Sequence, residues 1–363
     1  MKQRTKVIVD AMGGDFAPQS AVEGAVDACR EYNSEIILVG KEKEIKSELN
    51  KLNFTGLPIS IINASEVVEM HDNPLDVLKK KKKDSSINVA MNLLNDGEGD
   101  AFFSAGNSGA VATAGLFILK RIKGIDRPGI ATLMPTIKDH AVVTDAGATN
   151  LCKPFNLVQF GIMGSVYSKY FLKKNNPTVG ILSNGEEETK GTDTIKEAHQ
   201  LLKKSSLNYI GYVEGKDVFN GGVDVVVCDG FTGNIVLKVA EGVAGALGKV
   251  LKEELTGSLR AKIGLMFSKS ALLNFKKRFN YEEIGGAPLL GVRKPIMFAH
   301  GRSNPFTIKN AIRGIIEFTE TNIIYHIEND LEINNDLHTL GKKPSFISKV
   351  LKDIHLKKTP TEE

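Results

Sequence analysis

Short runs of apolar, mostly β-branched residues alternate along this chain with longer stretches whose apolar residues recur at helical spacing. Strands of this kind, each followed by a helix of ten residues or more, are typical of a parallel sheet with helices on both faces. The alternation therefore predicts a Rossmann-like α/β/α sandwich with a mostly parallel sheet. The predicted strands are 6–10, 35–40, 59–62, 100–104, 141–144, 178–182, 209–213, 223–227 and 296–298.

Five of the predicted strands end in turns of small or polar residues. Because the carboxyl ends of parallel strands meet at one edge of a sheet, we expect the five turns to lie together there, where α/β proteins bind ligands. One such turn alone is better explained by an ordinary helix cap, but five favour an active site. The turns are MGGD (12–15), SAGNSGA (104–110), DAGATN (145–150), SNGEEETKGTD (183–193) and DGFTGN (229–234).

A helix that starts directly after such a turn points its free N–H groups and the positive end of its dipole at one spot, which suits an anion. Glycines in the turn let the backbone approach the ligand closely. The predicted binding residues at this edge are Asp10, Gly13, Gly14, Asp15, Ser104, Gly106, Asn107, Ser108, Asn184, Asp193, Asp229, Thr232, Gly233 and His300.

Several other classes of site are disfavoured by the sequence. It has no GxGxxG after a strand, no Walker A motif, no HExxH and no GxSxG, so we expect no cofactor and no metal. Cys29, Cys152 and Cys228 lack partners for a disulfide framework or a zinc site, which fits a reducing cytoplasm. The remaining candidate functional groups are glycine turns, amide and hydroxyl donors, and Lys190. This set suits a reaction in which a bound anion, and not a side chain of the protein, attacks the substrate.

The net charge of the chain does not indicate a binding partner, but the positions of its basic residues do. A net charge of +4 over 363 residues is too small to argue for nucleic acid. Residues 79–83 are five consecutive lysines, which form either a solvated helix face or a docking site for an acidic partner. Residues 249–278 predict a basic amphipathic pair of helices, either packed in a dimer interface or lying on an anionic membrane, and both can hold for one hairpin.

Seven ordered motifs carry a resemblance to a known family: VDAMGGDFAP, SAGNSGA, RPGIA, SNGEEETKGTD, VEGKDVF, VVVCDGFTGN and GGAPLLGV. Together they resemble the PlsX family of bacterial phosphate acyltransferases from about residue 7 to residue 313. The resemblance implies transfer of a long-chain acyl group from an acyl-carrier-protein thioester to inorganic phosphate, which gives acyl phosphate for phospholipid synthesis. It also implies a fold similar to phosphotransacetylases and to isocitrate and isopropylmalate dehydrogenases.

The family's partners and residues follow from the same resemblance. It implies a homodimer in the cytoplasm, peripherally bound to the inner face of the cell membrane, that works with an acidic carrier protein and a downstream membrane glycerol-3-phosphate acyltransferase. Carried over by position, Lys190 and Asn234 are the catalytic residues. Thr149 and Arg302 depart from the family pattern, which puts the roles of Asn150 and Arg302 in question. Carrier or membrane contact is implied for Lys79, Lys80, Lys81, Lys276, Lys277 and Arg278.

The expected layout is one catalytic domain, 1–345, with the helical hairpin 246–283 inserted in it and a polar tail, 346–363. Two other functions are compatible with the residues. One is a phosphotransacetylase that uses acyl-coenzyme A, and the other is an anion-sensing membrane scaffold without catalysis.

Overall fold

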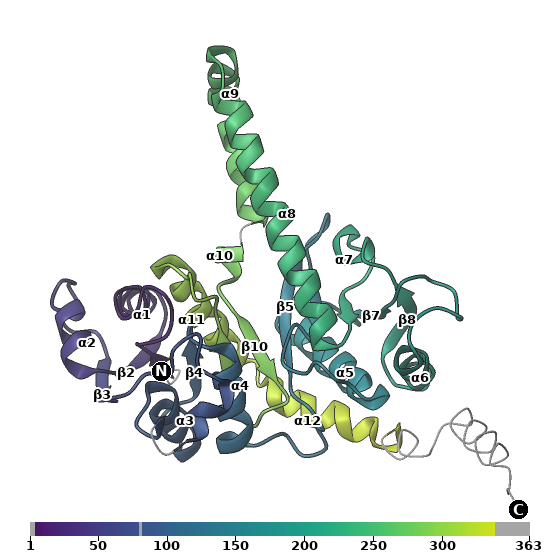
Figure 1. Ribbon diagram of the computed structural model, residues 1–363, viewed down its shortest axis with the longest axis horizontal. Coiled ribbons are helices and arrows are strands. Elements are labelled where there is room, and N and C mark those ends of the chain that lie inside the picture. The colour runs from purple at the N-terminus through teal and green to yellow at the C-terminus, as the bar shows by residue number, and fades with distance from the viewer. Residues whose placement is uncertain (1–3, 80–81, 280, 338–363) are drawn as a thin grey trace, which may run out of the picture.

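A computed structural model of the chain describes residues 4–79, 82–279 and 281–337. In these residues a sheet of 11 strands forms the centre of the body, and helices cover both of its faces (Figure 1). The predicted α/β/α sandwich is confirmed. The order of the strands across the sheet is β3-β2-β1-β4-β11-β10-β5-β6-β9-β7-β8. Their bounds are Thr5–Asp10 (β1), Ser34–Gly40 (β2), Ile59–Asn63 (β3), Ala101–Ser104 (β4), Gly129–Pro135 (β5), His140–Thr144 (β6), Thr178–Leu182 (β7), Asn208–Val213 (β8), Val225–Val227 (β9), Ala287–Leu290 (β10) and Ile296–Phe298 (β11).

The central strands are apolar throughout because both of their faces are covered. Successive side chains of a strand point to opposite faces. In β1, Val7 and Val9 pack into the cluster formed with α1 and α11, whereas Ile8 packs into the cluster formed with α3 and α4. All three side chains are fully buried. The continuous apolar run that predicted this strand therefore reflects two cores, one on each side of the sheet.

The sheet does not have the single edge that the sequence predicted. β10 pairs antiparallel with both β11 and β5, and β5 pairs antiparallel with β6. Three antiparallel pairings lie between the two parallel halves, so the strands β1, β4 and β11 run in the opposite direction to β6, β9 and β7. The five turns consequently belong to two groups that leave the sheet in opposite directions.

The register brings the strand ends of the two groups next to neighbouring residues of the central strand β10. The last residue of β4, Ser104, lies opposite Phe298, which lies opposite Ala287. On the other side, the last residue of β6 is paired with Ala131, one residue beyond the pair that Ile130 forms with Leu289. The carboxyl ends of both halves thus lie near the middle of the sheet.

The helices connect the strands and cover them, and α5 is buried along most of its length between the C-terminal half of the sheet and α12. The predicted terminal helix, 308–329, is instead two helices, α11 and α12, because Asn322 adopts a left-handed conformation with φ of 51° between them. The bounds are Gln19–Glu31 (α1), Glu42–Leu49 (α2), Pro74–Leu78 (η1), Ser86–Asp96 (α3), Ser108–Ala114 (α4), Gly115–Leu119 (η3), Pro154–Tyr170 (α5), Asp193–Leu202 (α6), Asp217–Asn220 (α7), Gly230–Thr256 (α8), Leu259–Phe279 (α9), Tyr281–Ile284 (α10), Pro305–Glu320 (α11) and Ile323–Ile333 (α12).

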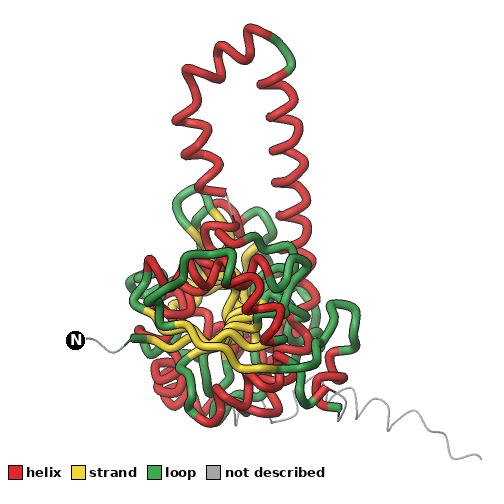
Figure 2. The backbone as a smooth tube through the Cα atoms, turned by 90° about the vertical axis from the view of Figure 1, so that its left-hand side faces the viewer, coloured by secondary structure: helices red, strands yellow, loops and turns green. Residues whose placement is uncertain are grey.

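A long arm rises from the body and consists of α8 and α9, which run side by side in opposite directions (Figures 1 and 2). The helix α8 begins inside the body, at the end of β9, and leaves it after about three turns, beyond Ala240, so the arm is a direct extension of the turn after β9. Within the described residues, no helix is both long enough and apolar enough to cross a bilayer. The predicted tail, 346–363, lies outside the described residues.

Candidate functional site

The turns after β1 and β4 pack directly against each other. The Ser104 hydroxyl donates to Asp10 Oδ2 at 2.7 Å, and the Gly106 N–H donates to Ser104 Oγ at 3.0 Å. A Cβ atom on Gly13 would lie 2.7 Å from both Asp10 Oδ2 and the Gly106 nitrogen, so only glycine fits there. Asp10 and Ser104 are at most 1% exposed, and burial raises the pKa of Asp10. Both side chains therefore support the glycine turns from below and do not reach their outer surface.

Asn107 is occupied within the protein. Its side-chain oxygen caps α4 by accepting the Ala110 N–H, and its amide donates to the carbonyl groups of Glu69, Met70 and Asp72 at 3.0 to 3.2 Å. The side chain is 7% exposed. Asn107 thus holds the segment before η1 in place, and a direct contact with a ligand, for which the sequence proposed it, stays a prediction.

The turn after β1 also contacts the turn after β11. The Asp15 N–H donates to the Gly301 carbonyl at 2.7 Å, and Gly14 has a φ of 105°, which favours glycine. Asp15 and His300 are exposed, as is Ser108, the first residue of α4. The helix α1 begins at Gln19, after the segment AMGGDFAP as the sequence indicated, so the turn 11–18 separates Gly13 and Gly14 from the free N–H groups of the helix.

After β9, the helix α8 begins at Gly230, five residues earlier than Ile235, where the sequence pattern indicated its start. Asp229 is the N-cap: its carboxylate accepts both the N–H of Thr232, at 2.9 Å, and the hydroxyl of Thr232, at 2.8 Å. The Gly233 N–H donates to the Asp229 carbonyl, and the Gly230 N–H donates to the Thr149 carbonyl. The N–H groups of Gly230, Thr232 and Gly233 are thus used inside the turn, and anion binding at this helix start stays a prediction.

Asn234 remains the available donor of this turn. It stands in the first turns of α8 and is half-buried. Among the described residues its amide has no hydrogen-bond partner in the protein. An amide at the start of a helix, close to the positive end of the helix dipole, is suited to stabilise a negative oxygen.

Lys190 lies in the turn that follows β7, the strand beside β9 in the sheet. Asn184 shapes this turn by accepting the Gly191 N–H at 2.9 Å, and Glu188 ties it to α6 through an ion pair with Lys203 at 2.7 Å. Lys190 is exposed, and within the described part of the chain no carboxylate pairs with its ammonium group. Asp193 is exposed in the first turn of α6. Because β7 and β9 are parallel neighbours, the turns that carry Lys190 and Asn234 leave the sheet at the same edge, next to each other.

Asp145 is a site residue that the sequence reasoning did not single out. It follows β6 directly and is fully buried, and burial raises the pKa of its carboxyl group to about 6. Four backbone N–H groups donate to this carboxylate. The only local signal was an acidic residue at the end of a buried strand. In the same turn, the Thr149 hydroxyl donates to the Pro128 carbonyl, whereas Asn150 is exposed.

The lysine run is less free than its sequence indicates. Lys79 pairs with Asp76 at 2.6 Å, and Lys82 pairs with Asp72 at 3.2 Å and donates to the Val67 carbonyl. Through these two contacts, Lys82 links the lysine run to residues 67–72. Lys80 and Lys81, and the side chains of Lys276, Lys277 and Arg278, lie outside the described part of the chain, so their roles stay predictions.

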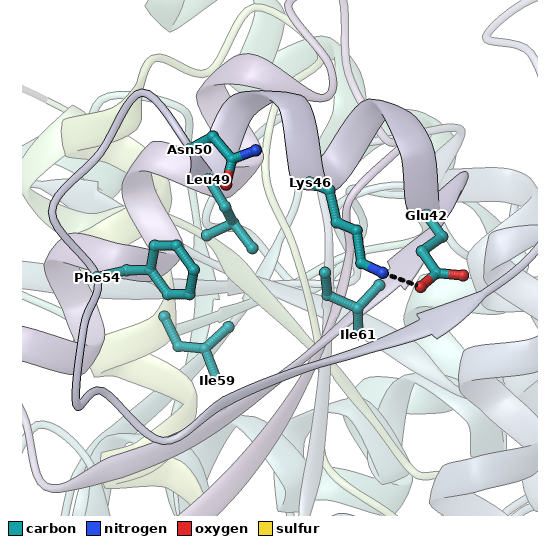
Figure 3. A pocket seen from close by; sticks show the side chains of 7 residues that line it. All are labelled: Glu42, Lys46, Leu49, Asn50, Phe54, Ile59 and Ile61. Atoms are coloured by element: carbon teal, nitrogen blue, oxygen red, sulfur yellow. Dashed lines mark ion pairs between the residues drawn. The ribbon is translucent and has the colours of Figure 1, made fainter.

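A shallow pocket of about 420 Å³ lies at the far edge of the sheet, between α2 and β3. Leu49, Phe54, Ile59 and Ile61 form its floor, and the ion pair of Glu42 with Lys46 stands at its rim (Figure 3). None of the predicted site residues lines it. The pocket is therefore separate from the turns at the strand ends.

The fold is that of the phosphotransacetylases. The phosphotransacetylase EutD from Staphylococcus aureus superimposes with a TM-score of 0.59 at 17% identity, over 88% of this chain and 94% of that one. A phosphotransacetylase from Streptococcus pyogenes gives 0.59 at 18% identity, over 88% and 95%. At such identities the likeness concerns the fold alone.

Sequence relatives define the family more closely. A phosphate acyltransferase from Geotalea daltonii is 53% identical over 92% of this chain and 96% of its own length, and one from Syntrophotalea carbinolica is 54% identical over 86% and 90%. A family model described as fatty acid synthesis protein matches residues 5–326. The chain belongs to this family, the PlsX phosphate acyltransferases, and is an acyltransferase.

Proposed function

We propose that this acyltransferase moves a long-chain acyl group from the thioester of an acidic acyl carrier protein to inorganic phosphate. The observation that carries the proposal is that, in the part of the chain that the structure describes, neither the Asn234 amide near the start of α8 nor the Lys190 ammonium in the neighbouring turn has a partner. Family membership supplies the reaction class. Phosphate is itself a nucleophile, so the chemistry requires no nucleophilic side chain from the protein.

The reaction follows from these two groups. A phosphate oxygen attacks the thioester carbonyl carbon, the carbon–sulfur bond breaks, and the carrier leaves as a thiolate that takes up a proton from solvent. The carbonyl oxygen becomes negative in between, and the Asn234 amide stabilises it. The Lys190 ammonium offsets the charge of the phosphate as it approaches. A thiolate is a good leaving group, so a strong general acid is not required.

The acyl donor can be tested directly. We expect acyl phosphate to form from inorganic phosphate and acyl carrier protein thioester faster than from the matching acyl-coenzyme A, with hydroxamate trapping as the measurement. The second candidate, a phosphotransacetylase-like reaction, is favoured by the fold of the two structural relatives. A preference for acyl-coenzyme A would support that reaction, and phosphate binding without turnover of either donor would support a non-enzymatic anion sensor.

The partners of the proposed reaction follow from its chemistry. The carrier is acidic, and Lys79 offers it an exposed ammonium beside the segment that Asn107 holds in place. The product is a reactive acyl phosphate, which a membrane glycerol-3-phosphate acyltransferase consumes in phospholipid synthesis. The protein works as a homodimer in the cytoplasm, at the inner face of the cell membrane.

The arm is the proposed site of membrane association. Apolar side chains are exposed along both of its helices, and Met266 and Phe267 are 75% and 84% exposed. Lysine and arginine side chains stand among them, including Lys262 and Lys269. Apolar and basic residues on one helical surface fit an anionic bilayer. The same apolar surface suits a second copy of the chain, which supports the homodimer.

Replacing Met266 and Phe267 together by glutamate is expected to weaken binding to phosphatidylglycerol vesicles at least about tenfold. Burial of one large apolar side chain contributes roughly 1.5 to 3 kcal/mol. Vesicle co-sedimentation measures the loss, while turnover of a soluble donor should persist. Ile333→Glu, which alters an equally exposed apolar residue on α12, is the control and should bind as the parent does. Joint loss of binding and turnover would point instead to the dimer or to folding.

A further inference from the structure

We propose that Asp145 is a positioning residue for the reaction: its carboxylate sets the backbone of residues 145–149, and these residues fix the start of α8, whose second turn begins with Asn234. The inference rests on the proposed function of Asn234. It concerns a residue that is fully buried and that acts through its neighbours.

The carboxylate of Asp145 is saturated with backbone donors. Its Oδ1 accepts the N–H groups of Ile130, Gly147 and Ala148 at 2.8, 3.0 and 2.9 Å. Its Oδ2 accepts the Thr149 N–H at 2.6 Å. A carboxylate offers about four lone-pair sites, and the four donors match that number, three of them on Oδ1 and one on Oδ2. Three of the four donors belong to the turn itself, and their directions therefore dictate the shape of the turn.

The turn is in close contact with the start of α8. A Cβ atom on Gly233 would lie 1.9 Å from the Asp145 carbonyl oxygen, and one on Gly230 would lie 2.6 Å from Asp145 Oδ2. The Gly230 N–H also donates to the Thr149 carbonyl at 2.9 Å. The first turn of α8 thus lies on residues 145–149 without a gap, and a displacement of one is transmitted to the other.

Asn234 lies beside the same turn. A Cβ atom added to Gly147 would lie 3.7 Å from Asn234 Cβ and 3.9 Å from its Oδ1. Gly147 is held by the Asp145 carboxylate through its N–H group. One residue, Gly147, therefore stands between the carboxylate and the candidate catalytic amide. Because the amide has no hydrogen-bond partner of its own among the described residues, the position of this turn limits where the amide can lie.

Ionisation of Asp145 is coupled to the shape of the turn. The four-acceptor arrangement requires the carboxylate, whereas burial raises the pKa of this group to about 6. The titratable groups that interact with it are the thiols of Cys152 and Cys228; Asp229 in turn acts on both thiols, and Arg127 acts on Cys152. Burial raises the pKa of both thiols, so they stay neutral in this range. As the pH falls through about 6, one oxygen gains a proton and becomes a weaker acceptor for its N–H donor, and the turn loosens.

The test is Asp145→Asn, assayed for acyl phosphate formation from carrier thioester over pH 5 to 8. The new amide places an NH₂ group against a backbone N–H, so we expect kcat to fall about a hundredfold, the typical cost of a misplaced catalytic group, with KM for phosphate little changed. The parent should lose kcat below about pH 6. The variant should show no such loss, because asparagine does not titrate.

A double-mutant cycle separates positioning from a general structural effect. In the Asn234→Ala background, Asp145→Asn should have little further effect on kcat, since both changes remove the same contribution. Asp224→Asn is the matched control, because this carboxylate also accepts a backbone N–H and a hydroxyl, both from Thr178, but at the opposite end of β9. It should leave kcat and its pH profile as in the parent.

A second variant covers the case in which Asp145→Asn does not fold. Gly147→Ala leaves the carboxylate in place but introduces a Cβ at a φ of 138° against Asn234. It should lower kcat and keep the loss below pH 6. A folded Asp145→Asn protein with parental kcat, or full additivity with Asn234→Ala, would overturn the proposal. A parent that forms no acyl phosphate from either donor would overturn the proposed function and with it the role of Asn234.

Discussion

Gly233→Ala is expected to destabilise the protein by at least about 3 kcal/mol, a large effect for one methyl group. The added Cβ would lie 1.9 Å from the Asp145 carbonyl oxygen and 3.0 Å from Cys228 Sγ. The first of these atoms belongs to the backbone of a fully buried residue and cannot rotate away. Either α8 or the turn after β6 must shift, which separates the two segments that form the site around Asn234. Differential scanning calorimetry should show a midpoint several degrees lower, with activity lost even below that temperature.

The control for this prediction lies in the same helix. Gly242 stands in α8 further out, and a Cβ there would meet nothing within 4 Å. Gly242→Ala should therefore be neutral or stabilise the helix by up to about 1 kcal/mol, the difference in helix propensity between the two residues. A parental midpoint for Gly233→Ala would mean that the packing of α8 on the turn after β6 is looser than these distances state.

The tight contact at Gly233 also shows what the sequence could and could not predict. Short apolar runs predicted nine of the strands, because a strand that is buried on both faces is apolar at every position. The strands β5 and β10 were missed, since Pro128, Gly129 and Pro288 interrupt the apolar pattern there. These two strands supply the antiparallel pairings that reverse the direction of half of the sheet. The pairing of β10 with β5 joins segments more than a hundred residues apart, and no local pattern specifies the sense of such a pairing.

Some residues of the candidate site were predictable from the sequence, and others were not. The glycine turns that carry Lys190 and Asn234 were predictable because each follows an apolar strand. The start of α8 was also within reach, since Asp229 followed by Thr232 is an N-cap pattern, but the glycines at 230 and 233 obscured it. Asp145 was not predictable, because one of its donors, Ile130, comes from β5, a strand without a sequence signal. Its importance depends on burial and on four hydrogen bonds, which exist only in the folded chain.

The reversal of the sheet matters for the mechanism as well. The turns with Asp10, Gly13 and Ser104 belong to one half of the sheet, and those with Lys190 and Asn234 belong to the other. The proposed catalytic pair is therefore contributed by neighbouring strands of a single half, β7 and β9. Substitutions in that half should affect the chemical step, and this gives the catalytic proposal its most direct test.

Asn234→Ala should lower kcat at saturating phosphate by about a hundredfold or more, because one preplaced donor to a developing oxyanion contributes about 3 kcal/mol. Asn234→Asp keeps the shape of the side chain but puts a negative charge where the oxyanion forms, so its kcat should be lower still. Lys190→Ala should lower kcat by a similar factor to Asn234→Ala, since it leaves the phosphate charge without a counterion. The exposed Lys204, near the end of α6, provides the matched control, and Lys204→Ala should turn over as the parent does. Single-turnover formation of acyl phosphate measures the chemical step itself, and near-parental turnover of either Asn234→Ala or Lys190→Ala would remove that residue from the mechanism.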